Sequence, residues 1–165
     1  MEVRVNMKKL FVGLGALGFL CLSGSGYSQM GMMHGRGMMH GRGMQHMSMV
    51  RHHFVMQHGI DPKYASAVNP LKATVDNMKE GKRLYEQHCA VCHGPTGVGN
   101  GEAGKNLTPP PANIAALGKM PMATDGYLSW TIAEGGAPLG TAMPPFKGVL
   151  KEDEIWKIVI YLREM

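Results

Sequence analysis

The sequence predicts an all-α protein: a small fold of three or more short helices, preceded by a disordered N-terminal extension. Three observations lead to this prediction. Residues 151–163 place apolar side chains on one helical face, residues 94–125 are dense in Gly and Pro, and residues 29–60 form a low-complexity repeat. The chain of 165 residues has room for one domain of ordinary size and a remainder that needs a separate account.

The first 28 residues have the pattern of a secretory signal. Lys8 and Lys9 lead into an apolar run over residues 10–22, and small residues follow up to Ser28. The 13 residues of this run are fewer than the roughly 20 that a membrane-spanning helix needs. We therefore expect removal after Ser28 and a periplasmic or secreted protein, with an uncleaved membrane anchor as the alternative.

Residues 29–60 repeat a short unit rich in Met and His. The unit Gly-Met-Met-His-Gly-Arg occurs twice in succession from Gly31, and His34, His40 and His46 follow each other at intervals of six residues. This period fits neither a helix nor a strand, and the repeated glycines make ordering costly in entropy. The segment is therefore predicted to be disordered.

The same repeat is a candidate copper site. Thioethers suit Cu(I) and imidazoles suit Cu(II), so a run of both resembles periplasmic copper-binding segments. The tentative ligands are His34, His40, His46, Met32, Met33, Met38 and Met39. The alternative is a passive tether or a sacrificial target for oxidation.

A linker at residues 61–73 is predicted to lead into a folded domain at residues 74–165. The formal charge of +5 divides into +6 before residue 74 and −1 after it. The basic charge therefore lies outside the region that looks able to fold, and we expect no nucleic-acid partner.

Three helices are predicted within this domain. The first spans residues 75–87, and the second runs from Asp125, a good N-cap residue, to residue 134, before two glycines. The third, at residues 151–163, is the clearest, and its apolar face consists of Ile155, Ile158, Val159 and Leu162. The glycines and prolines of residues 94–125 favour an irregular wrap with short turns at most.

Cys89-Ala90-Val91-Cys92-His93 is the attachment pattern for a c-type haem. Two thiols at this spacing can add across the two vinyl groups on one porphyrin edge, and the adjacent His can then reach the iron. Three short helices would also bury little apolar surface alone, so a large apolar cofactor would complete the core. The alternatives are a thioredoxin-like redox pair, which lacks βαβ surroundings here, and half of a zinc site, which lacks a second Cys pair.

The second axial ligand is expected from a loop late in the chain. Met143 lies among the prolines of residues 140–146, which stiffen the loop before the last helix. Met120 and Met122 are rival candidates. A thioether ligand raises the reduction potential and closes the position where oxygen or peroxide would bind, and this favours electron transfer over catalysis.

Residues 78–165 resemble a class I monohaem cytochrome c. The resemblance covers residues 81–85, 89–94, 97–101, 109–114, 140–146 and 154–161. It implies that His93 and Met143 ligate the iron and that a proline carbonyl among Pro109, Pro110 and Pro111 accepts a hydrogen bond from His93 Nδ1. It further implies that the first and last helices cross at Gly81, Tyr85 and Tyr161. We expect Trp130 and Trp156 to belong to the core, with a position beside the haem ligands as the alternative. The long extension and the lack of a lysine-rich ring on the domain depart from the family pattern.

The function expected is transfer of single electrons through one covalent haem c, without enzymatic activity of its own. The partners would be redox proteins such as a respiratory complex or a dehydrogenase, and membrane contact would come only through a partner or an uncleaved signal. The first alternative is a cytochrome subunit of a larger oxidase or dehydrogenase complex. Copper handling coupled to redox chemistry and haem catalysis are two further alternatives.

Overall fold

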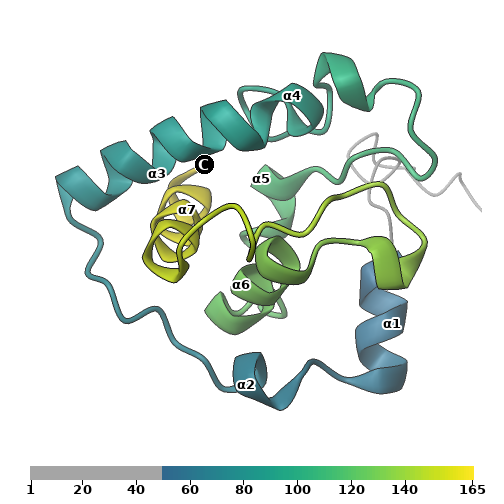
Figure 1. The fold of residues 1–165 in the computed structure, drawn as a ribbon, viewed down its shortest axis with the longest axis horizontal. Coiled ribbons are helices and arrows are strands. Elements are labelled where there is room, and N and C mark those ends of the chain that lie inside the picture. The colour runs from purple at the N-terminus through teal and green to yellow at the C-terminus, as the bar shows by residue number, and fades with distance from the viewer. Residues whose placement is uncertain (1–49) are drawn as a thin grey trace, which may run out of the picture. The chain divides into compact units, whose positions relative to one another are not determined.

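The computed structural model describes residues 50–165, and every regular element within them is helical (Figure 1). The elements are α1 (Val50–His58), α2 (Pro62–Ala65), α3 (Val75–His88), α4 (Ala90–His93), η1 (Glu102–Gly104), α5 (Ile114–Leu117), α6 (Asp125–Glu134), η2 (Ala137–Leu139) and α7 (Glu152–Glu164), of which η1 and η2 are 3-10 helices. This confirms the all-α prediction. The predicted signal and the tentative copper ligands His34, His40, His46, Met32, Met33, Met38 and Met39 lie outside the described residues.

The first and last helices of the predicted domain, α3 and α7, cross in close contact (Figure 1). Gly81 makes this approach possible, because a β-carbon there would overlap the carbonyl oxygen of Lys157. Next to it, the rings of Tyr85 and Tyr161 pack with their centroids 5.4 Å apart. The crossing that the resemblance implied at Gly81, Tyr85 and Tyr161 is therefore present.

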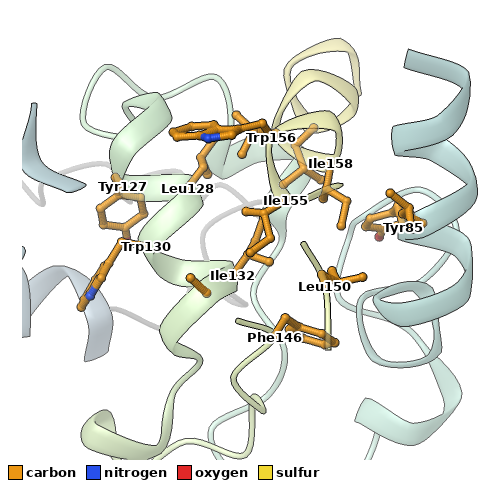
Figure 2. Close-up of a cluster of buried hydrophobic side chains, with 14 of the residues drawn as sticks. Tyr85, Tyr127, Leu128, Trp130, Ile132, Phe146, Leu150, Ile155, Trp156 and Ile158 are labelled. Atoms are coloured by element: carbon orange, nitrogen blue, oxygen red, sulfur yellow. The ribbon is translucent and has the colours of Figure 1, made fainter. Parts of the chain in front are cut away.

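The hydrophobic core lies between α6 and α7 and extends to α3 (Figure 2). On α7 the predicted apolar face is buried throughout, and its members are Ile155, Ile158, Val159 and Leu162. Trp130 and Trp156 are also buried, which confirms their expected place in the core. α6 is buried on most of its surface and so forms the centre of the domain.

α6 spans the predicted residues 125–134, but its N-cap residue differs from the prediction. Thr124, not Asp125, is the N-cap residue, and its hydroxyl accepts a hydrogen bond from the Tyr127 amide at 3.1 Å. Asp125 instead forms an ion pair with Arg163 on α7, at 2.8 Å. Since both residue types cap helices well, the position of the Arg163 guanidinium decides which of them does so. The end of the helix at Gly135 agrees with the prediction.

Residues 50–73, which precede the predicted domain, pack against it. In the segment expected to be disordered, α1 forms from residue 50, within a stretch free of glycine between Gly43 and Gly59. Its Phe54 stacks on Trp130, with ring centroids 6.2 Å apart. This burial of apolar surface supplies the stabilisation that the sequence of α1 alone does not predict.

The predicted linker also contains a helical turn, α2, that docks on α6. The Tyr64 hydroxyl donates a hydrogen bond to Glu134 at 2.9 Å. Gly126 lets the Tyr64 carbonyl come close, because a β-carbon at Gly126 would overlap that oxygen. Within residues 50–165, none of the helices combines the length and the apolar character that crossing a membrane requires.

Candidate functional site

A cavity of about 590 Å³ opens among the helices of the domain. Its walls come from α1, α3 and α4, from the segment at residues 107–122, from α6, from the loop at residues 139–146, and from α7. Most of the lining side chains are apolar, including Leu128, Ile132 and Phe146. A site of this size and character suits a large apolar ligand.

One wall of the cavity carries Cys89, Cys92 and His93. Cys89 ends α3 and begins α4, and its carbonyl accepts the amides of Cys92 and His93 at 3.1 and 2.9 Å. This single helical turn brings both thiols and the imidazole to the same cavity. The predicted juxtaposition of these three residues is therefore present in the structure.

Cys89 does not have the character of a reactive thiol. It is not joined to Cys92 by a disulfide, and burial, together with the neighbouring Cys92, raises its pKa to about 12. A reactive thiol needs a lowered pKa instead. The half zinc site finds no support either, since no three His, Cys, Asp or Glu side chains within residues 50–165 gather as metal ligands.

The His93 ring is held by a backbone carbonyl. Its Nδ1 lies 3.0 Å from the Ala112 oxygen, and since a carbonyl can only accept, Nδ1 carries the proton and Nε2 keeps its lone pair. Burial lowers the pKa of His93, which favours the neutral imidazole that binds metals.

The acceptor for His93 differs from the expectation. The resemblance implied a carbonyl among Pro109, Pro110 and Pro111, but Ala112, one residue later, accepts the bond. The Pro111 oxygen instead packs against Gly99, so closely that a β-carbon there would overlap it. The next carbonyl along the chain is the one that faces His93.

Met143 lines the cavity on the loop that follows η2. The backbone of this loop is anchored at both ends: the Gly136 amide donates to the Met143 carbonyl at 2.8 Å, and the Phe146 amide donates to the Ile132 carbonyl at 3.1 Å. Met120 and Met122 line the same cavity. The fold thus brings all three candidate thioethers to one site.

The sequence analysis missed two residues of the site. Arg51 and His52, both on α1, line the cavity, although they lie in the segment expected to be disordered. The signal that could have located them is the loss of glycine after Gly43, which marks the end of the repeat.

Comparison with known proteins agrees with this geometry. A family model described as "Cytochrome C oxidase, cbb3-type, subunit III" matches residues 76–162. The chain belongs to this family. The domain is therefore a c-type cytochrome domain with one haem c as the implied cofactor, and electron transfer is its function.

Two relatives place this cytochrome domain among larger redox proteins. The chain is 31% identical over 94 residues to the quinohemoprotein alcohol dehydrogenase ADH IIB of Pseudomonas putida, covering 56% of this chain and 12% of that protein. A solved structure, the reducing HAO-like protein complex of Kuenenia stuttgartiensis, aligns with a TM-score of 0.50 and 28% identity. That alignment covers 58% of this chain and 46% of the other. The cytochrome domain thus spans about one eighth of the first relative and less than half of the second chain.

The residues present in the cavity fit a haem. The macrocycle is large and mostly apolar, as the cavity lining is, and the paired thiols and the imidazole with its available Nε2 share one wall. The thioethers that line the same cavity supply candidates for a second axial position.

Proposed function

We propose that this protein is an exported electron carrier whose haem is attached through Cys89 and Cys92, with His93 and Met143 as the axial ligands of the iron. One observation carries the proposal: the Ala112 carbonyl holds His93 Nδ1 at 3.0 Å, so that Nε2 is the ring nitrogen able to bind a metal beside both thiols. The bound haem supplies the one-electron chemistry. The protein contributes attachment, ligation and an apolar environment.

Met143 is the preferred distal ligand because prolines and backbone hydrogen bonds constrain its loop. Pro144 and Pro145 follow it directly, the Gly136 amide donates to the Met143 carbonyl, and the Phe146 amide donates to the Ile132 carbonyl. A ligand held in this way loses little further freedom on binding. A thioether in this position raises the reduction potential and keeps small molecules from the iron, so we expect no catalytic activity from the protein alone.

Export is supported by the sequence pattern of the first 28 residues and by the absence of any cysteine other than Cys89 and Cys92 after residue 28. The alternative role, a cytochrome subunit of a larger oxidase or dehydrogenase complex, is supported by relatives in which this kind of domain is one part of a longer chain. Redox partners are expected in both roles. Purification from periplasm separates the two: a soluble monomer supports the carrier, and stable co-purification with an oxidoreductase contradicts it.

The haem site is tested on the full-length protein matured with haem. We expect a mass increase of one haem and a redox titration with one electron per chain. Cys89→Ala together with Cys92→Ala should abolish covalent attachment. A titration without a haem signal in the wild-type protein would overturn the proposal.

The distal ligand is tested with three matched variants. Met143→Leu should remove the thioether signature from the ferric optical spectrum and lower the midpoint potential. Met120→Leu and Met122→Leu each remove a thioether from the lining of the same cavity, and both variants should keep the signature. Loss of the signature in either control, with retention in Met143→Leu, would assign the ligand to the segment before α6.

A further inference from the structure

Three buried side-chain atoms lack a hydrogen-bond partner among the described residues, and all three belong to residues that line the large cavity. They are Arg51 Nη1, His52 Nδ1 and Thr131 Oγ1. Buried polar atoms in folded proteins nearly always have partners, because an unpaired one carries the full cost of desolvation. Their common location indicates that the partner is the molecule that fills the cavity.

Arg51 is held firmly in place without an acidic partner. Its Nη2 donates to the Gly135 carbonyl at 2.5 Å, and its guanidinium carbon lies 4.8 Å from the centroid of the Trp130 ring. No Asp or Glu within residues 50–165 lines the cavity or pairs with Arg51. A guanidinium stays protonated in proteins, so a positive charge lies at the cavity wall with Nη1 available for an anion.

The chemistry of these groups selects a carboxylate. A guanidinium donates to carboxylate oxygens in a charge-assisted bond, and a threonine hydroxyl and an imidazole N–H can donate to the same group. Haem carries two carboxylate side chains, on the side of the macrocycle away from the vinyl groups that cysteines take up. In Figure 1, α1 and α4 lie on different sides of the fold, and residues of both line the cavity.

We propose that Arg51, with His52 and Thr131, binds a carboxylate of the haem, so that α1 completes the cofactor site of the domain. The inference rests on the proposed function. It assigns a binding role to a helix that lies before the family match at residues 76–162. The proposal also explains why α1 is ordered against the domain although its sequence has no clear apolar face. Phe54 stacks on Trp130, and Arg51 and His52 line the cavity.

The expected consequence is electrostatic. Reduction adds one negative charge to the haem, and a nearby buried cation favours that form. Removal of the Arg51 charge should therefore lower the midpoint potential. An arginine that only packs against Trp130 would affect stability and leave the potential unchanged.

The test uses the full-length holoprotein, with the midpoint potential and urea unfolding measured on each variant. Arg51→Met removes the charge and keeps an apolar stem, and Arg51→Lys restores the charge. Thr131→Val removes one hydroxyl with little change of shape. If Arg51→Met folds poorly, the midpoint potential of Thr131→Val tests the proposal in its place. Arg83→Met is the matched control, because Arg83 lies on the exposed face of α3, pairs with Glu80 and does not line the cavity.

We expect a lowered potential in Arg51→Met, recovery of most of the shift in Arg51→Lys, a smaller decrease in Thr131→Val, and no shift in Arg83→Met. His52→Gln should leave the thioether signature of the wild-type protein unchanged. A wild-type spectrum of two imidazole ligands that changes in His52→Gln would make His52 an iron ligand and overturn its assignment here. Wild-type potentials in both Arg51→Met and Thr131→Val would overturn the proposal. Covalent haem in the wild-type protein, established first by mass, tests the proposed function separately.

Discussion

The carbonyl oxygen of Lys157 occupies the place where a β-carbon at position 81 would stand. The backbones of α3 and α7 are therefore in direct contact at Gly81. This contact joins the helix that leads into Cys89 to the helix that ends the chain. The position of the thiol wall of the cavity therefore depends on a helix contact at Gly81, a residue that does not itself line the cavity.

Gly81→Ala should destabilise the protein. The added methyl group forces the helices apart, and overpacking of this kind costs typically about 1–3 kcal/mol. The measurement is the free energy of unfolding in urea. Gly148→Ala is the control, because Gly148 is exposed in a turn with no atom near the added carbon, and we expect a change within about 0.5 kcal/mol. Equal unfolding free energies in the two variants would contradict the role of the crossing.

Tyr85→Phe should also reduce stability. The Tyr85 hydroxyl is fully buried and donates to the Gly94 carbonyl at 2.6 Å, directly after the attachment motif. The substitution removes the shorter of the two hydrogen bonds that the Gly94 carbonyl accepts and leaves the one from the Gly97 amide at 3.2 Å, at a cost of about 0.5–1.5 kcal/mol in unfolding free energy. Tyr161→Phe, on the half-buried partner ring, should change the same quantity by less than about 0.5 kcal/mol. A larger loss in Tyr161→Phe would show that the hydrogen bond to Gly94 matters little.

Gly135→Ala should disturb the proposed Met143 ligand. Gly135 has φ 66° and ψ −151°, and an added β-carbon would lie 2.7 Å from the Met143 oxygen. Backbone strain at such a position costs about 1–3 kcal/mol, and the clash moves the loop. Gly140→Ala shares the positive φ, 67°, but meets no atom within 4 Å. We expect weakening of the thioether signature in Gly135→Ala alone, and a weakening of equal size in both variants would refute the steric explanation.

The anchoring of α2 should depend on pH through Glu134. The hydrogen bond from Lys147, assisted by the one from Tyr64, lowers the pKa of Glu134 below its ordinary value of 4.5. A carboxylate with a lowered pKa in the folded state contributes stability above its unfolded pKa and loses it as the pH falls through the folded pKa. Glu134→Gln should therefore be less stable than wild type at neutral pH, and the difference should shrink below pH 4.5.

The control for this prediction is Glu86→Gln, which removes a carboxylate from an exposed pair with Lys82 on one helix face. Its effect on unfolding free energy should stay below about 0.5 kcal/mol. Urea unfolding of both variants across the acidic range provides the comparison. A Glu134→Gln difference that stays constant from neutral to acidic pH would exclude the ionised carboxylate as its source.

Copper binding by the Met/His repeat remains a prediction from the sequence. A variant with His34, His40 and His46 changed to Gln and Met32, Met33, Met38 and Met39 changed to Leu removes the soft ligands and retains the chain length. If the repeat binds copper, Cu(I) affinity measured by competition should fall at least about tenfold relative to wild type, since thioethers are the ligands that select Cu(I). Equal affinities would leave the repeat as a tether.

The sequence by itself predicted much of the domain. Apolar periodicity and capping residues located α3, α6 and α7, and the spacing of Cys89, Cys92 and His93 predicted that the three meet in one place. These features are local: a helical turn and a side-chain repeat depend on neighbours within a few residues. For the same reason the buried face of α7 could be read directly from its pattern.

Only the tertiary structure decided which groups meet across the fold. The choice of Ala112 as the partner of His93, of Arg163 as the partner of Asp125, and of Gly135 as the acceptor for Arg51 depends on segments 19, 38 and 84 residues apart in the chain. All three pairings lie far beyond the range of local patterns. The order of α1 is the clearest case, because its stabilisation comes from the Trp130 ring and the cavity wall and not from its own sequence.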